Sequence, residues 1–149
     1  MTQRTTTELS APHSDTSLIS VYERPEHLIL LWNLLAERAA SQSISHHEMP
    51  TWRQHVEFVM SKPYEAWYFI IVDDEPVGVV YLTRRNEIGV FIFNGHQKKG
   101  HGRAAVKALM EKHGLRRYLA NVNPANEATR FLFQGLGFQL CQHTYELRA

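Results

Sequence analysis

The apolar and polar positions of the chain switch repeatedly between the period of a strand and the period of a helix. A capping box formed by Thr51 and Gln54 begins one helix, and Gly114 ends another. Two runs of β-branched and aromatic residues flank the acidic turn 73–76, which predicts a hairpin. The expected helices are 25–40, 51–61, 101–113 and 124–137, and the expected strands are 18–23, 66–72, 77–83, 86–93, 117–122 and 138–147.

Length and composition fit one compact domain, 18–149, after a loose tail, 1–17, that is rich in Thr and Ser. The net charge of +1 leaves no basic surface of the kind that nucleic acid requires. A single cysteine, Cys141, allows no disulfide within the chain, which suits a reducing compartment. No signal peptide or membrane span is visible. We therefore expect a cytoplasmic protein that binds neither nucleic acid nor membrane.

The hexapeptide from Gln97 to Gly102 joins an apolar strand to an alanine-rich helix. Its two glycines allow close backbone approach, and the free N–H groups and positive dipole end of a helix start favour an anion. The junction predicts a site for a pyrophosphate, although such a hexapeptide alone is equally compatible with an ordinary turn. The candidate cofactor-binding residues here are Gln97, Lys98, Lys99, Gly100, His101, Gly102 and Arg103.

A second signature lies downstream, where Asn126 is followed by Gly137-Phe138. Together the two segments resemble the GNAT superfamily of acyl-CoA-dependent N-acetyltransferases. The hexapeptide matches the family's Gln/Arg-x-x-Gly-x-Gly/Ala loop, and the downstream segment matches its Asn-to-Gly-Phe segment. The resemblance covers roughly residues 18–147, with its diagnostic residues between Glu87 and Phe138.

The resemblance implies an α/β protein of the α+β kind. Its mixed sheet would be splayed near the cofactor and flanked by four helices, in the order β-αα-βββ-α-β-α-β. It also implies acetyl-CoA as co-substrate and no metal. Family members usually finish with two strands, and little chain follows Phe138. The last hairpin would then be missing or supplied by a second copy, which favours a homodimer.

Acetyl transfer requires a neutral amine, and a lysine-like amine with a pKa of ~10.4 is free base only about once in 2,500 molecules at pH 7. A base therefore helps, and the resemblance implies Glu87, acting directly or through water. The alternative is a solvated charge paired with Arg84 or Arg85. Asn121, on the strand beside the splay, is a second catalytic candidate, and a routine outward polar position is its alternative.

The resemblance also places a backbone N–H donor for the thioester oxygen around Phe91, Ile92 and Phe93, so these join the cofactor-binding candidates with Asn126 and Phe133. The tyrosine that often protonates the CoA thiolate in this family is replaced here by Phe133. Either another group such as Tyr145 supplies the proton, or the thiolate leaves to solvent.

A segment rich in histidine and aromatic residues precedes the second helix, in the region that shapes the acceptor pocket in GNAT proteins. Adjacent histidines seldom bind one ion, so a zinc site is disfavoured. These groups could instead stack on or hydrogen-bond a sugar ring, although a half-buried histidine with a structural role is the plainer interpretation of the last of them. The candidate substrate-binding residues are His46, His47, Trp52 and His55.

Together these features predict an N-acetyltransferase that moves an acetyl group from acetyl-CoA to a primary amine of a small molecule. An amino sugar is favoured as acceptor, and direct transfer in a ternary complex is favoured over an acyl-enzyme on Cys141. A protein N-terminal acetyltransferase is an alternative. Phe133 also keeps open a non-catalytic acyl-CoA-binding sensor module, whereas an interaction domain without CoA would make both motifs coincidental.

Overall fold

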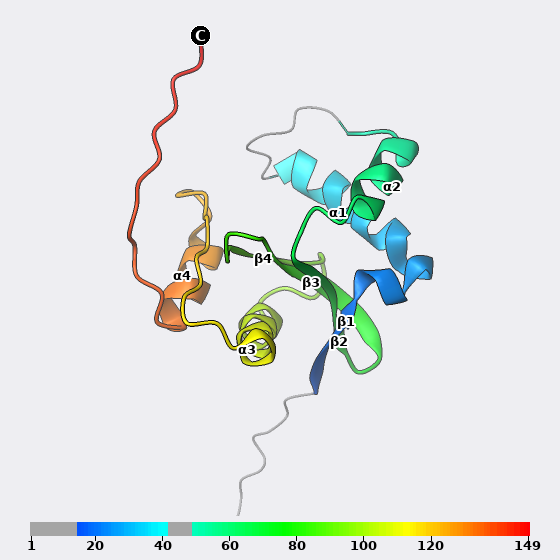
Figure 1. Ribbon diagram of the computed structural model, residues 1–149, viewed down its shortest axis with the longest axis horizontal. Coiled ribbons are helices and arrows are strands. Elements are labelled where there is room, and N and C mark those ends of the chain that lie inside the picture. Colours follow the sequence, from blue (N-terminus) through cyan, green and yellow to red (C-terminus); the bar gives the residue numbers. More distant parts are fainter. Residues whose placement is uncertain (1–14, 42–48) are drawn as a thin grey trace, which may run out of the picture.

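A four-stranded antiparallel sheet forms the centre of the protein, and its strands lie side by side in chain order (Figure 1). The structure is a computed structural model that describes residues 15–41 and 49–149. The strands are β1 (Thr16–Ser20), β2 (Ala66–Val72), β3 (Glu75–Leu82) and β4 (Ile88–Ile92).

The expected hairpin is present as β2 and β3, and it is the centre of the sheet. Its two-residue turn places both Asp73 and Asp74 at positive φ, 52° and 63°, as a tight turn between twisted strands requires. Both strands are apolar along nearly their whole length because helices cover both faces of the sheet.

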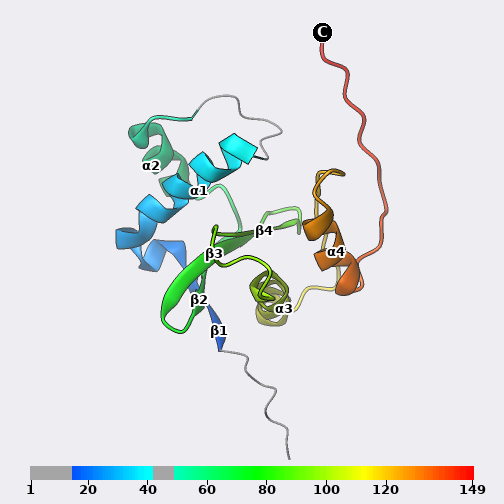
Figure 2. The ribbon, with the colours of Figure 1, turned by 180° about the vertical axis from the view of Figure 1, so that it is seen from behind.

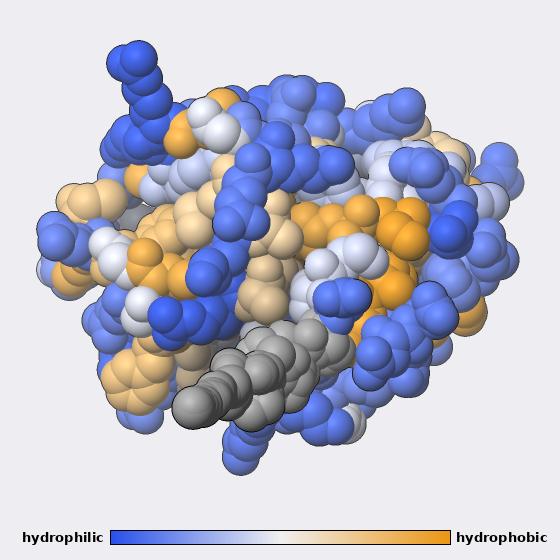
Figure 3. Space-filling view, turned by 90° about the horizontal axis from the view of Figure 1, so that it is seen from below, coloured by the Kyte–Doolittle hydropathy of each residue, from blue (hydrophilic) through white to orange (hydrophobic). Residues whose placement is uncertain are grey.

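Four helices cover the two faces in pairs, as Figures 1 and 2 show from opposite sides. Helices α1 (Leu28–Ser41) and α2 (Trp52–Met60) lie on one face, and α3 (His101–His113) and α4 (Glu127–Gly135) on the other. Successive strand residues point to opposite faces, so Phe69 belongs to the core beneath α1 and α2 whereas Ile70 belongs to the core beneath α3. On the face seen in Figure 3, hydrophilic residues predominate and apolar residues show in patches between them.

Two helices begin later than the sequence predicts. Pro25 starts a short 3-10 turn, η3 (Pro25–His27), after η2 (Val21–Glu23), and α1 follows only from Leu28. The start of α4 is capped by Asn126, whose side-chain oxygen accepts a hydrogen bond from the Thr129 N–H at 3.2 Å. Asn123 instead closes a local turn by accepting from the Ala125 N–H at 2.9 Å. An asparagine before a proline can cap a helix or close a turn, and here it closes a turn.

The predicted strands 117–122 and 138–147 do not form. Residues 117–122 contribute only an isolated parallel bridge between Leu119 and Glu87. From 138 to 149 the chain has no regular structure and runs away from the body of the protein (Figures 1 and 2). A strand needs a neighbouring ladder, and none lies beside this segment in the described part of the chain. The α+β fold with four helices is thus confirmed, whereas the mixed sheet and the full predicted order are wrong.

Helix α2 turns a different face to the core than the stripe of Trp52, Val56, Val59 and Met60 suggests. Trp52 and Met60 are 44% and 51% exposed, whereas His55 is only 3% exposed and lies one turn before the fully buried Val59. The His55 ring packs against Trp32 and Trp52, with centroids 5.6 Å from each. Burial lowers the pKa of His55, and the nearby Leu28 backbone offsets only part of this effect. A neutral imidazole therefore takes a core position.

We expect the burial of His55 to make the fold sensitive to acid. Its pKa is lower in the folded chain than the ordinary value of 6.5, so the unfolded chain binds the proton more readily. The free energy of unfolding should therefore fall as the pH drops below about 6.5, and should be insensitive to this group above that value. Urea denaturation between pH 5 and 8 measures this, and His55→Phe should flatten the acid limb. The exposed His143 gives a matched control, since His143→Phe should leave the slope unchanged; an unchanged slope in His55→Phe would contradict the prediction.

The extended end of the chain should contribute little to stability. Residues 139–149 are exposed, whereas Phe138 packs against Phe133 with ring centroids 5.0 Å apart. A chain ending after Gln139 should therefore unfold within about 0.5 kcal/mol of the full chain. Phe138→Ala in the full chain should cost about 1–2 kcal/mol, because it empties a half-buried position. Equal losses in the two variants by chemical denaturation would show that the end of the chain is packed in solution.

Candidate active site

A cleft opens where β4 and the segment after Leu119 diverge. Two backbone hydrogen bonds hold the segments together at one point: Ile88 N–H donates to the Leu119 carbonyl at 2.7 Å, and Leu119 N–H donates to the Asn86 carbonyl at 2.8 Å. Beyond this bridge lies a cleft of about 380 Å³. It is lined by residues from β3, β4, the segment 121–126 and α4.

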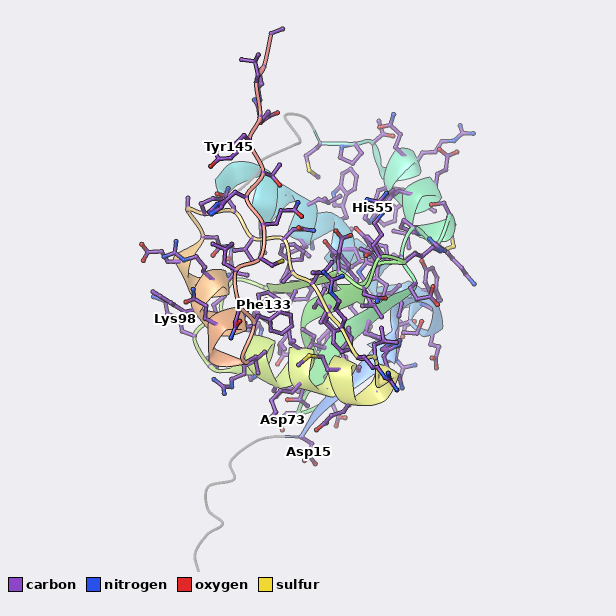
Figure 4. The ribbon with its side chains drawn as sticks, turned by 60° about the vertical axis from the view of Figure 1, so that its left-hand side comes forward. Asp15, His55, Asp73, Lys98, Phe133 and Tyr145 are labelled. Carbon is purple, nitrogen blue, oxygen red and sulfur yellow. The ribbon has the colours of Figure 1, made fainter. Side chains whose placement is uncertain are left out.

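The cleft reaches both sides of the sheet. Its wall includes Phe133, which belongs to the core beneath α3 and α4, and Tyr81 and Phe91, which pack on the side of α1 and α2. In Figure 4, Phe133 on α4 and His55 on α2 lie on opposite sides of the sheet. Two ligands could therefore enter from opposite faces and meet beside β4.

Glu87 lines this cleft, and two hydrogen bonds fix its carboxylate. Thr83 Oγ1 donates to one oxygen at 3.0 Å, and Asn121 Nδ2 donates to the other at 2.8 Å. The alternative partners do not bind it: the Arg84 guanidinium donates to the carbonyls of residues 62 and 63, and Arg85 donates its backbone N–H to Thr83 Oγ1. Glu87 and Asn121 thus lie together at a cavity wall.

The open edge of β4 offers backbone donors to the cleft. Along β4 and its two ends, the N–H groups of the odd-numbered residues point toward β3, because the two strands pair in antiparallel register. The 2.8 Å hydrogen bond from the Phe93 N–H to the Val77 carbonyl shows this direction. The N–H of Ile88 points the other way, to Leu119. By the same alternation, the N–H groups of Val90 and Ile92 point away from β3. Of the three predicted positions, Ile92 therefore has the suitably directed N–H, whereas that of Phe93 is used within the sheet.

The predicted phosphate loop joins β4 to α3 and leaves the first turn of that helix accessible. Gly100 is the N-terminal cap, with φ of 83°, and no side chain caps the helix. The first intrahelical bond comes from Ala104 N–H to the Gly100 carbonyl, so the earlier N–H groups have no partner within the helix. Lys98 and Lys99 are exposed beside them. The accessible N–H groups and the two neighbouring lysines are suited to binding a phosphate group.

His101, at the start of α3, has a lowered pKa. Burial is the main cause, and the nearby positive charges of Lys99 and His96 add to it, while Asp73 opposes them. The basic loop therefore carries its positive charge mainly on lysines at neutral pH. The Gln97 side chain is turned back to the strand, where Nε2 donates to the Ile92 carbonyl at 3.1 Å.

The other cofactor candidates have structural contacts of their own. Gly102 is buried, and a Cβ there would lie 2.8 Å from Leu132 Cδ1 on α4, so this glycine allows two helices to pack closely. The Arg103 guanidinium lies over Gly135 of α4. Asn126 and Phe133 both line the cleft, the first as the cap of α4 and the second as a buried ring.

The structure adds Tyr81, Gly89 and Thr83 to the site residues found from sequence. Tyr81 pairs with Gly89 across β3 and β4, and its ring lies where a Cβ of residue 89 would be. Only glycine leaves room for this ring at the cleft wall. A glycine inside an apolar strand is a known sign of close approach, so Gly89 could have been noticed in the sequence.

The predicted acceptor residues are only partly described. His46 and His47 lie outside the described residues. His55 lines a second cavity, between the helices and the sheet, while Trp52 packs on its outer side. Tyr145 is 89% exposed on the extended end of the chain (Figure 4), so the structure does not bring it to the cleft.

The described part of the chain contains neither a group of side chains suited to a metal ion nor a helix suited to a membrane. Within residues 15–41 and 49–149, no three or more His, Cys, Asp or Glu side chains are grouped so that they could hold a metal ion. In the same residues, no helix has the length and apolar character needed to cross a membrane.

Comparison with known proteins gives the family. The model of the Acetyltransferase (GNAT) family matches residues 28–138. No curated protein matches the chain.

Solved structures share the fold at low identity. AAC(6')-Iy in complex with the bisubstrate analog CoA-S-monomethyl-acetylneamine has 17% identity and a TM-score of 0.60, covering 92% of this chain and 98% of its own. Spermidine N-acetyltransferase from Vibrio cholerae, with CoA and spermine, has 19% identity and a TM-score of 0.72, covering 86% and 83%. RimL, a ribosomal L7/L12 alpha-N-protein acetyltransferase with CoA, has 18% identity and a TM-score of 0.69, covering 83% and 79%.

The family model spans well over half of the chain and includes both sequence signatures. The resemblance seen in the sequence is therefore confirmed: the protein belongs to the GNAT acetyltransferase family and is an acetyl-CoA-dependent N-acetyltransferase.

Proposed function

We propose that the protein transfers the acetyl group of acetyl-CoA directly to a primary amine of a small molecule while both are bound. The observation that carries this proposal is a carboxylate, Glu87, held by Thr83 and Asn121 at the wall of a cleft beside the open edge of β4. The cleft volume of about 380 Å³ lies in the range of small-molecule pockets, which run from ~300 to 1,000 Å³.

Binding of acetyl-CoA is assigned to the loop and to the strand edge. The N–H groups at the start of α3, with Lys98 and Lys99 beside them, would hold the pyrophosphate. The outward N–H groups of Val90 and Ile92 would bind the amide-bearing arm and the thioester oxygen. Phe133 and Phe91 supply apolar walls on the two sides of the sheet. The residues present therefore fit the co-substrate.

Glu87 would act as the base. The amine nitrogen forms a bond to the thioester carbon, the carbon–sulfur bond breaks with its electron pair on sulfur, and the amine's proton passes to Glu87, directly or through water. Asn121 and Thr83 keep the carboxylate in place during this transfer. Phe133 has no proton to donate, and a thiol with an ordinary pKa of ~8.5 can leave as the thiolate.

A charge at Gly100 should abolish cofactor binding. Nothing lies within 4 Å of a Cβ at this position, and aspartate tolerates its positive φ, so Gly100→Asp should fold. Its carboxylate would repel the pyrophosphate, and we expect acetyl-CoA affinity to fall about tenfold or more in calorimetric titration. Gly100→Asn adds a side chain of the same shape without the charge, so it measures the steric part of the loss, and we expect it to bind acetyl-CoA more tightly than Gly100→Asp does. Equal affinity in the two variants would refute the phosphate site.

Removal of the base should slow turnover without weakening cofactor binding. Glu87→Gln preserves size and can still bond to Thr83, but it cannot accept a proton. With an acceptor of pKa ~10, the acetylation rate at pH 7 should fall by about 10²-fold or more, measured as CoA release. The Kd for acetyl-CoA should change less than about twofold.

The acceptor itself provides the control for Glu87→Gln. An amine with a pKa near 8 is already about one-tenth neutral at pH 7, so it needs the base less, and its loss should be smaller. Equal losses with both amines would mean that Glu87 positions a reactant and does not take the proton.

A further inference from the structure

Three asparagines line the cleft beside β4, and their amide oxygens are used differently. Asn123 Oδ1 accepts a hydrogen bond from a backbone N–H at 2.9 Å, and Asn126 Oδ1 accepts one from another backbone N–H at 3.2 Å. Asn121 instead uses its nitrogen, which donates to Glu87 at 2.8 Å. Among the three, Asn121 is therefore the one whose amide oxygen has no protein partner within residues 15–41 and 49–149.

The Glu87 carboxylate fixes which way the Asn121 amide points. A carboxylate accepts hydrogen bonds and donates none, so the amide atom beside it must be the nitrogen. Asn121 is exposed at the cleft wall, so its oxygen is open to a ligand.

The other oxygen of the Glu87 carboxylate is held by Thr83 in an equally defined way. The Thr83 hydroxyl accepts from the backbone N–H groups of Arg85 and Glu87, at 3.2 and 3.1 Å. Both of its lone pairs are thereby used, and its single proton is left for Glu87 Oε1 at 3.0 Å. Thr83 thus holds the carboxylate but has no hydrogen-bonding capacity left for a substrate, whereas Asn121 has an oxygen to spare.

Glu87 and Asn121 Oδ1 form a pair of acceptors with the spacing that one amine needs. Asn121 Nδ2 lies 2.8 Å from Glu87 Oε2, and the two heteroatoms of an amide are about 2.3 Å apart, so the two acceptor oxygens are at most about 5 Å apart. Two N–H groups of one nitrogen reach acceptors roughly 4–5 Å apart, because each N···O distance is ~2.9 Å. A carboxylate oxygen accepts two hydrogen bonds, so the bond from Asn121 leaves room for one more.

We propose that Asn121 Oδ1 binds the reacting nitrogen of the acceptor, and that its pairing with Glu87 selects a primary amine over a secondary amine. The inference rests on the proposed function of the cleft. One N–H of the neutral amine donates to Glu87 and the other to Asn121, which leaves the lone pair of the nitrogen directed at the thioester carbon. A secondary amine has one N–H and satisfies only one of the two acceptors.

The two acceptors treat their protons differently. As the amine nitrogen bonds to the thioester carbon, the carbon–sulfur bond breaks with its electron pair on sulfur, and the nitrogen has to lose one proton. Glu87 takes that proton, because a carboxylate is a much stronger base than an amide oxygen. The proton facing Asn121 stays on nitrogen and becomes the N–H of the product amide. Asn121 therefore orients the amine and takes no proton from it.

A primary amine and its N-methyl derivative test the assignment, because methylation removes one N–H and leaves an amine of similar basicity. With the natural chain, we expect kcat/KM, compared at equal concentrations of free-base amine, to be about fivefold or more higher for the primary amine, since one hydrogen bond is lost. Calorimetric titration of each amine into the complex with CoA, which cannot react, should show a similar ratio of Kd values above the pKa of the amine. Equal values for the two amines would overturn the inference.

Variants of Asn121 separate hydrogen bonding from shape. Asn121→Leu keeps the approximate shape without the carbonyl, so the preference for the primary amine should fall below about twofold. Asn121→Asp keeps an oxygen for the amine and should keep the preference, at a lower rate because two neighbouring carboxylates repel each other. An unchanged preference in Asn121→Leu would mean that shape alone excludes the methyl group, and would refute the role of Oδ1. Asn121→Ala gives a second variant without the carbonyl, should the leucine variant not fold.

Thr83→Val is the matched control for the position of the base. It removes the other hydrogen bond to Glu87 but no contact with the amine, so it should slow both amines alike and keep their ratio. Loss of the preference in Thr83→Val would show that the position of Glu87 sets it, against the inference. Asn33→Ala, on the exposed side of α1 and outside the cleft lining, should leave both rates unchanged.

The outcomes also separate this inference from the function on which it rests. In each result that contradicts the role of Asn121, acetyl-CoA still binds and amines still release CoA. Absence of acetyl-CoA binding by calorimetry, or of CoA release with every amine, would overturn the proposed function and the role of Asn121 with it.

Discussion

The two backbone hydrogen bonds between Leu119 and the start of β4 are the contact on which the whole site depends. Within the described residues, they are the one place where the backbone after α3 hydrogen-bonds to the backbone at the edge of the sheet, at 2.7 and 2.8 Å. Because pairing stops there, the next residues of β4 keep an open edge, and a cleft forms between the diverging segments. Asn121 follows Leu119 by two residues, so the bridge also places the Asn121 side chain beside the Glu87 carboxylate. A longer ladder would close the cleft, and without the bridge Asn121 would not be placed beside the Glu87 carboxylate.

The two glycines of the loop, Gly100 and Gly102, are needed for two different physical reasons. Gly100 is exposed at φ of 83°, and nothing occupies the space where its side chain would be. Glycine is needed at position 100 for the backbone conformation that leaves the start of α3 open. Gly102 has ordinary φ but is buried under Leu132. Glycine is needed at position 102 because a side chain there would keep α4 from packing closely on α3. This close packing fixes the position of Phe133 at the cleft. In the proposed phosphate site, the first glycine would therefore serve the ligand directly, and the second would serve it through packing.

Local patterns predicted most elements of the fold, and long-range pairing accounts for what they missed. The capping box at Thr51, the hairpin around Asp73 and the end of α3 at Gly114 depend on neighbours in sequence, and all three are present. Whether 117–122 and 138–147 become strands depends on distant backbone partners, which no local pattern contains. The pairing of Glu87 with Asn121 is equally distant in sequence, so their identity as candidates came from family resemblance. The burial of His55 depends on how α2 is rotated, which its sequence stripe did not reveal.

The two sides of the sheet have opposite electrostatic environments. On the side of α3, exposed Lys98 and Lys99 can neutralise phosphates that remain partly hydrated, so binding there needs little desolvation. On the side of α1 and α2, neutral His55 and aromatic rings favour a group that has already lost its charge. An amine attacks only in its neutral form, so an environment that disfavours ions also favours the reactive state of the acceptor. The cleft beside β4 lies between these two environments, and the Glu87 carboxylate lines it.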